Sequence, residues 1–111
     1  MDLNIVNVSG HFVRDPVIRR SEMGITVGWF TLQSDYCYED HEGARCEDTA
    51  FVTCKAVGPF ADALARRRRG DFIYVTGRLR TETFRRGRNW QSGLMVIVDS
   101  LETRVSSRTL A

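Results

Sequence analysis

The chain has few of the features that would set it apart from ordinary globular proteins. Its three cysteines are an odd number in 111 residues, which argues against a disulfide framework. No apolar run approaches the roughly 18 residues that a membrane span needs. The segment Met1-Asp2-Leu3-Asn4-Ile5 lacks the basic and apolar stretches of a secretory signal. We therefore expect one cytoplasmic domain with a single hydrophobic core and no membrane partner.

Metal-binding and catalytic constellations are also missing. Cys37, His41 and Cys46 lie close together in one acidic segment, but a closed structural zinc site usually needs four ligands and a tight cysteine pair. No nucleophile–base pair, carboxylate pair or phosphate-binding loop has the spacing that catalysis requires. The sequence therefore predicts no enzyme, no metal site and no cofactor.

Lysine is almost absent, because 15 of the 16 basic residues are arginine and Lys55 is the exception. Within residues 35–48, six acidic residues against Arg45 alone give a formal charge of −5, so the rest of the chain carries +7. Arginine offers a planar fork for phosphate and a flat face for stacking on bases. A GC-rich genome is an equally good explanation of the arginine excess, but it does not explain where the arginines lie.

Residues 49–57 alternate with the period of two that is typical of a β-strand. One face of this strand carries small apolar side chains, namely Ala50, Val52, Cys54 and Ala56. The other face carries a ring and a cation, in the series Phe51, Thr53, Lys55 and Val57. A ring and a cation on a solvent face suit base stacking and phosphate contact.

The order of the remaining segments predicts the fold. Residues 36–48 are expected to form a long loop or an extended hairpin tip, and a helix is expected over about 59–69, from Pro59 to a cap at Gly70. The expected strands cover residues 3–14, 25–34, 49–57 and 71–80, followed by a hairpin over 85–98. This order predicts an all-β fold, a five-stranded OB-fold Greek-key barrel with one short helix between strands 3 and 4. We assign residues 1–104 to this domain and 105–111 to a short C-terminal extension.

A series of short motifs then resembles the bacterial single-stranded DNA-binding protein family. The motifs are Asn7-Val8-Ser9-Gly10, Asp15-Pro16, Phe30-Thr31-Leu32, Thr49-Ala50-Phe51, Arg69-Gly70, Val75-Thr76-Gly77-Arg78-Leu79 and Arg80-Thr81 with Phe84. Each motif is weak alone, but their shared order and spacing over residues 3–102 carry the resemblance.

The resemblance implies an OB-fold that binds single strands without sequence preference, usually as a homotetramer. Family members stack bases on four aromatic positions, which fall here on Tyr38, Phe51, Phe84 and the ringless Val57. Trp90 is a further stacking candidate near the tip of the last hairpin, whereas we expect Trp29 in a subunit contact or the barrel wall. The sequence does not contain the acidic tail through which family members recruit partners, so either the chain is a shortened form or tail-mediated protein partners are not expected.

Cations on or beside the proposed stacking face are the candidate phosphate contacts: Lys55, Arg69, Arg80, Arg85, Arg86 and Arg88. The acidic segment 35–48 is expected to weaken binding locally. The first strand is apolar on both faces, which indicates either a central strand or burial by a partner chain, and its place near a terminus favours a subunit interface. We therefore predict an oligomer interface at Ile5, Val6, Val8 and Tyr74.

Together these observations predict a sequence-independent single-stranded DNA-binding protein that protects DNA in replication, recombination and repair. We expect it to be nucleoid-associated and homo-oligomeric, with a tetramer favoured over a dimer. One alternative is a primosomal accessory OB-fold protein that binds single-stranded DNA and a helicase partner as a dimer. Another is an OB module that binds protein through its acidic segment.

Overall fold

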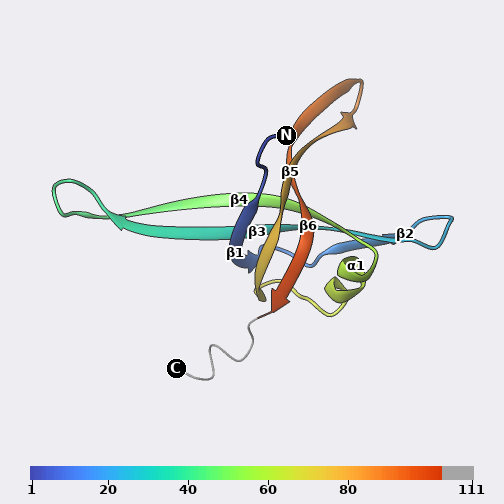
Figure 1. The fold of residues 1–111 in the computed structure, drawn as a ribbon, viewed down its shortest axis with the longest axis horizontal. Helices are drawn as coiled ribbons and strands as arrows, with labels where there is room; N and C mark the ends of the chain where they lie inside the picture. The colour runs from blue at the N-terminus through green and yellow to red at the C-terminus, as the bar shows by residue number, and fades with distance from the viewer. Residues whose placement is uncertain (104–111) are drawn as a thin grey trace.

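The computed structural model describes residues 1–103, apart from the side chains of Phe84, Arg86 and Thr103. Within this range the chain forms strands and one short helix, as the sequence predicts (Figure 1). The elements are β1 (Val6–Phe12), β2 (Val17–Arg20), β3 (Thr26–Glu39), β4 (Arg45–Val57), α1 (Pro59–Leu64), β5 (Phe72–Arg86) and β6 (Asn89–Thr103).

The strands form one sheet that closes on itself. Their order is β1-β5-β6-β4-β3-β2, and β1 also pairs with β3 through His11↔Gln33 and Phe12↔Leu32. The pairing of β4 with β6 is parallel, and the other pairings are antiparallel. Strands β1, β3, β4, β5 and β6 therefore make the predicted closed OB barrel, with β2 as an additional edge strand. Because β2 is counted, the helix lies between β4 and β5.

The barrel interior is filled by the inward side chains of the alternating strands. Cys54 and Ala56 are fully buried, as the period of β4 predicts, and Phe12 stacks on Phe30 with ring centroids 5.1 Å apart. Burial raises the pKa of the Cys54 thiol to about 12. Cys54 therefore remains a neutral, unreactive core residue at physiological pH.

The helix is shorter than expected because contacts with the rest of the fold end it. Ala61 and Leu64 are fully buried and close one end of the barrel, and Phe60 is partly buried against the same core. The expected helix to residue 69 and the expected cap at Gly70 are wrong. The helix ends at Leu64 with Ala65 as its C-cap residue, after which the backbone N–H of Arg68 donates to Asp71. The N–H of Gly70 donates instead to the carbonyl of Phe12 on β1.

The first strand is also shorter than expected, and Asn4 provides the reason. Pairing between β1 and β5 begins at Val6↔Gly77. The Asn4 side chain donates to the carbonyl of Leu79 and accepts from its N–H, both at 2.8 Å. A side chain thus makes the hydrogen bonds that a further strand residue would make.

Two hairpin arms extend from the barrel (Figure 1). The β3–β4 arm includes residues 36–48, so the hairpin alternative for this segment is correct and the loop alternative is wrong. Its turn is closed by a hydrogen bond from the N–H of Asp40 to the carbonyl of Ala44. The β5–β6 arm turns at Gly87, whose φ of 61° favours glycine. Within the described residues, no helix is long and apolar enough to span a bilayer.

Gly77 provides a test of how closely the strands approach. A methyl group on Gly77 would collide with the carbonyl of Ile97, at a register shift between β5 and β6. We predict that Gly77→Ala lowers the free energy of unfolding by about 1–3 kcal/mol, since an overpacked site must move backbone. Urea denaturation followed by circular dichroism measures this change.

Gly93→Ala is the matched control in the paired strand. A methyl group there meets no atom within 4 Å, so the free energy of unfolding should stay level or rise by up to about 1 kcal/mol. Equal destabilisation by the two substitutions would contradict the close approach at Gly77.

Candidate nucleic-acid interface

The outer face of β4 carries the ring and cation that the alternation predicts. Phe51 is 68% exposed and Lys55 is half-buried, whereas the alternate residue Cys54 is buried in the core. The cross-strand register pairs Phe51 with Gln33, and Lys55 with Trp29. We call this surface of β3 and β4, which includes Trp29, Phe51, Thr53 and Lys55, the outer face.

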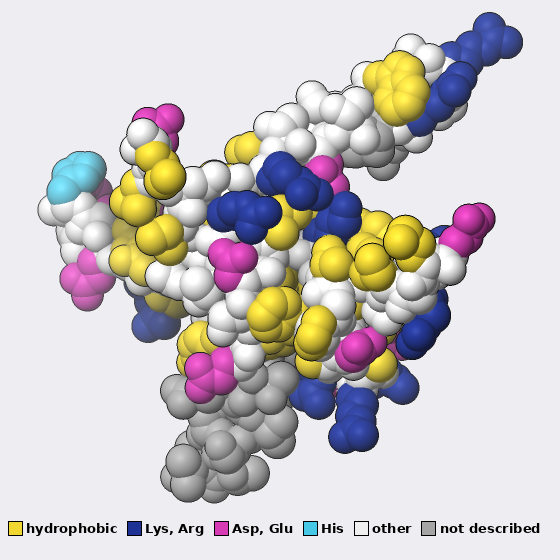
Figure 2. All heavy atoms as spheres, turned by 45° about the vertical axis from the view of Figure 1, so that its right-hand side comes forward, with side chains coloured by type: hydrophobic (Ala, Val, Ile, Leu, Met, Phe, Trp, Pro, Cys, Tyr) yellow, Lys and Arg dark blue, Asp and Glu magenta, His cyan; other side chains and the backbone are white. Residues whose placement is uncertain are grey.

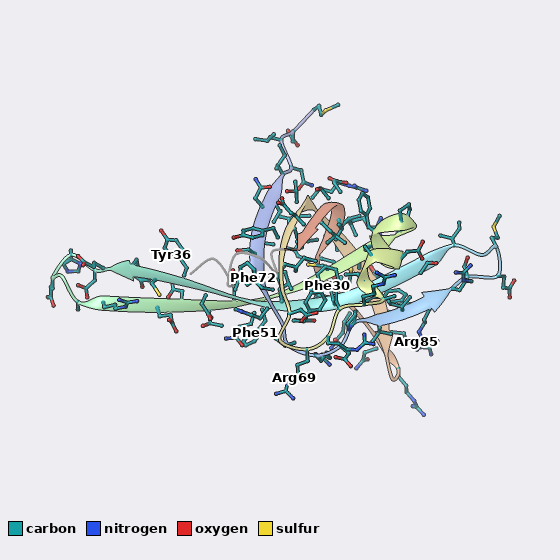
Figure 3. All side chains as sticks on the ribbon, turned by 90° about the horizontal axis from the view of Figure 1, so that it is seen from below. Phe30, Tyr36, Phe51, Arg69, Phe72 and Arg85 are labelled. Atoms are coloured by element: carbon teal, nitrogen blue, oxygen red, sulfur yellow. The ribbon has the colours of Figure 1, made fainter. Side chains whose placement is uncertain are left out.

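Tyr38 does not share this face. Its register partner is Cys46, an even-numbered position like Leu32 and Val52, which point toward the core side. Tyr38 stacks on Tyr36 with ring centroids 6.2 Å apart. Figure 3 shows Tyr36 and Phe51 on opposite sides of the β3–β4 arm. A nucleic-acid strand that contacts both Tyr38 and Phe51 must therefore cross an edge of the β3–β4 arm.

Tyr36 is an exposed ring that the sequence reasoning missed. Its side chain is 69% exposed, more than that of Tyr38. The available signal was its spacing of two residues from Tyr38, which in a strand places both rings on one face. The two tyrosines form a continuous aromatic surface on this side of the arm.

The Tyr38 phenol remains uncharged at neutral pH. The Asp48 carboxylate is the main cause of its raised pKa, followed by partial desolvation and by hydrogen bonds with Cys46 and Asp48. An uncharged ring can approach a polyanion without the repulsion that a phenolate would add. A phenol at its ordinary pKa of 10.0 is already uncharged at neutral pH, and the acidic residues of the arm only extend this state to higher pH.

Glu82 lies between two of the predicted phosphate-binding cations. Its carboxylate accepts from Lys55 Nζ at 3.1 Å and from Arg80 Nη2 at 3.0 Å. The bond from Arg80, and then the bond from Lys55, lowers the pKa of Glu82. Sequence reasoning missed this carboxylate, because only folding brings β4 and β5 together. A phosphate that binds Lys55 and Arg80 must displace Glu82 from them.

The β5–β6 arm combines cations with an exposed ring near its tip. Trp90 is 67% exposed, and the Arg85 guanidinium carbon lies 5.7 Å from its ring centroid. Arg88 is also exposed. Figure 2 shows basic and hydrophobic side chains together at the end of this arm. The predicted contacts at Phe84 and Arg86 concern side chains outside the described part of the structure.

An apolar hollow of about 190 Å³ joins Phe51 to the β5–β6 strands. Leu79 and Leu94 line it from β5 and β6, and both are exposed because they lie beyond the sealed core. The hollow places an apolar wall beside the exposed Phe51 ring. It connects the outer face with the basic arm.

The remaining predicted positions are dispersed around the barrel. Arg69 is exposed and projects from the same side as Phe51 (Figure 3). Ile5 and Tyr74 are exposed, while Val6 and Val8 pack partly against the core. Among the described residues, no group of three or more histidine, cysteine, aspartate or glutamate side chains is placed to hold a metal ion.

Comparison with known proteins places this chain in a family. Residues 3–104 match the Single-strand binding protein family. The chain is 31% identical over 100 residues to a single-stranded DNA-binding protein of Aquifex aeolicus, covering 89% of this chain and 68% of that protein. It is 25% identical over 101 residues to a protein of the same description from Fusobacterium nucleatum, covering 90% and 66%. The chain thus spans about two thirds of each relative's length.

Two solved structures share the barrel. A deletion mutant of the single-stranded DNA binding protein from Thermus aquaticus has a TM-score of 0.81 at 20% identity, covering 94% of this chain and 51% of that chain. The Plasmodium falciparum SSB in complex with ssDNA has a TM-score of 0.80 at 19% identity, covering 94% and 96%. At these identities the likeness shows the fold alone. Because the family match covers nearly the whole chain and the barrel is the predicted one, this protein belongs to the single-strand binding protein family.

Proposed function

We propose that this protein binds single-stranded DNA without sequence preference and protects it during replication, recombination and repair. The observation that carries the proposal is the exposed Phe51 ring on the same face as Lys55, in a chain of this family. The Aquifex and Fusobacterium relatives are named single-stranded DNA-binding proteins. The structural neighbour from Plasmodium is a complex with ssDNA.

Binding rests on stacking and charge, and no catalytic step is part of it. Each base stacked on a ring contributes about 1–3 kcal/mol, and every base has a face that can stack. Arginine and lysine side chains neutralise phosphates and release counterions, so affinity falls as salt rises. This mechanism accounts for sequence tolerance, because neither contact reads a base edge. A nucleoid-associated location follows from it.

Removal of the Phe51 ring tests the proposal. We predict that Phe51→Ala raises the Kd for oligo(dT) by roughly tenfold, as expected for the loss of one stacked base. Because Phe51 is largely exposed, the thermal midpoint should change little. Fluorescence anisotropy of a labelled oligonucleotide at low salt measures the Kd.

Met23→Ala is the matched control, because Met23 is an exposed apolar side chain near the β2–β3 turn, away from the outer face. It should bind oligo(dT) like the wild type. The proposal fails if the wild-type protein does not bind oligo(dT) at low salt. Equal affinities of the wild type and Phe51→Ala would show that Phe51 does not contribute to binding.

Glu82 is expected to limit affinity. We predict that Glu82→Gln tightens binding several-fold, because Lys55 and Arg80 are then free to bind phosphate. The dependence of log Kd on log salt should steepen by about 0.7 for each additional phosphate that these cations neutralise. Titrations of oligo(dT) at several salt concentrations measure both quantities. Glu22→Gln, in the β2–β3 turn, makes the same change in net charge at a remote position and should have little effect.

Protonation of Glu82 at low pH should make the wild type bind oligo(dT) like Glu82→Gln, because a neutral carboxyl no longer forms the ion pairs. A lowered pKa of Glu82 means that the ion pairs are fully present above the ordinary glutamate pKa of 4.5. They are lost as the pH falls through the lowered value in the folded protein. Identical salt slopes for Glu82→Gln and Glu22→Gln would show that Glu82 does not compete with phosphate.

We further propose that the protein is a homotetramer with an interface that includes Ile5, Val6, Val8 and Tyr74. Ile5 and Tyr74 are exposed, and they flank the partly buried valines of β1. We predict a solution mass of four 12.7 kDa chains by light scattering, and a lower mass for Ile5→Asp. A mass of two chains would favour the dimeric accessory role, and a mass of one chain would contradict the interface.

A further inference from the structure

A second hollow lies on the outer face near the base of the β3–β4 arm. Its volume is about 220 Å³, and Arg14, Val17, Trp29, Thr31 and Thr53 are among the residues that line it. Trp29 is only half-buried, so it is not part of the sealed core. The hollow therefore presents an indole ring and two threonine side chains to a ligand.

The strand register places this hollow on the same surface as Phe51. The pairs Trp29↔Lys55, Thr31↔Thr53 and Gln33↔Phe51 are alternate rungs of an unbroken ladder, so their side chains share one face. Trp29 lies four residues from the rung of Phe51, which is about 13 Å along the strand. The rings of Trp29 and Phe51 are therefore too far apart to stack on the same base. They follow one another along the direction of β3 and β4.

Two cations lie near the Trp29 ring. Lys55 Nζ lies 5.9 Å from the ring centroid, and Arg14 lines the hollow. Asp15 is the one acidic residue that lines it, and its carboxylate accepts a 2.7 Å bond from the backbone N–H of Arg69. That bond brings Arg69 to the edge of the hollow, on the side from which Phe51 also projects (Figure 3).

This combination of groups fits one nucleotide. An indole stacks on any base, guanidinium groups contact phosphate, and threonine hydroxyls can donate to or accept from a base edge. Trp29 also lies diagonally across the β3–β4 ladder from Val57, whose own partner is Val27. Diagonal neighbours are about 7–8 Å apart, so Trp29 supplies a ring close to the position where residue 57 has none.

We propose that the hollow beside Trp29 is a nucleobase subsite for single-stranded DNA. A base stacks on Trp29, while Arg14 and Arg69 contact the phosphates on one side and Lys55, once displaced from Glu82, contacts them on the other. The strand continues from this subsite along the outer face to Phe51. The inference rests on the proposed function, because it requires single-stranded DNA as the ligand.

Intrinsic fluorescence tests the subsite directly, because the chain has two tryptophans. In Trp90→Phe, Trp29 is the sole tryptophan, and its emission should be quenched by oligo(dT). The quenching should saturate at the same concentration as the anisotropy of a labelled oligo(dT). Unchanged Trp29 emission in a mixture that anisotropy shows to be bound would overturn the subsite.

A pair of substitutions then measures its contribution. Trp29→Leu keeps an apolar side chain without a ring, and it should raise the Kd for oligo(dT) by roughly tenfold. Trp29→Phe restores a ring and should recover most of the affinity. Equal binding by Trp29→Leu and the wild type would also overturn the subsite. If Trp29→Leu does not fold, Arg14→Ala replaces it, because Arg14 is exposed. Arg14→Ala should bind oligo(dT) more weakly than the wild type. An affinity equal to that of the wild type would count against the subsite.

The outcomes separate this inference from the proposed function. If the wild type does not bind oligo(dT), both fail. If the wild type binds and Phe51→Ala weakens binding, but Trp29 emission and Trp29→Leu affinity do not change, the subsite alone fails. A 5-iododeoxyuridine oligonucleotide cross-linked by light and mapped by mass spectrometry should mark Trp29, and cross-links restricted to other residues would count against the subsite.

Discussion

The continuous pairing of β3 with β4 is the constraint on which the rest of the structure depends. Along this ladder, from Val27↔Val57 to Glu39↔Arg45, no residue is skipped. One set of rungs places Leu32 and Cys54 in the core, and the alternate set places Phe51 on the surface. A shift of one residue would exchange the two sets, so burial of the core fixes the composition of the outer face. The composition of the proposed binding surface is thus a consequence of how the core is packed.

The sequence predicted what depends on neighbouring residues and missed what depends on contacts between distant ones. Alternation within one strand was enough to place Phe51 outside and Cys54 inside, and to predict the barrel. It could not place Tyr38 relative to Phe51, because that relation depends on the length of the turn between the two strands. Glu82 was missed because folding alone brings it to Lys55, and the helix end was missed because a bond to Phe12 helps to set it.

Acidic side chains on this surface neutralise part of its positive charge, so charge contributes less to the affinity for DNA. Glu82 occupies two cations, and the acidic residues of the β3–β4 arm oppose the basic β5–β6 arm. A surface of this kind attracts phosphate less strongly than its number of arginines suggests. The rings must then supply more of the binding free energy, at about 1–3 kcal/mol for each base. Such a surface favours single strands, because only unpaired bases offer their faces for stacking.

An aromatic ring can lie on either of two paired strands and still be on the same face of the sheet. Side chains on diagonal rungs of one face lie about 7–8 Å apart, so a ring at Trp29 and a ring at residue 57 reach overlapping space. A position without an aromatic residue, such as Val57, can therefore have a ring close to it on the neighbouring strand. What the chain must keep is the face, and the β3–β4 register keeps Trp29, Lys55 and Phe51 on one face. For that reason, stacking positions in this fold are better identified from the cross-strand ladder than from one strand alone.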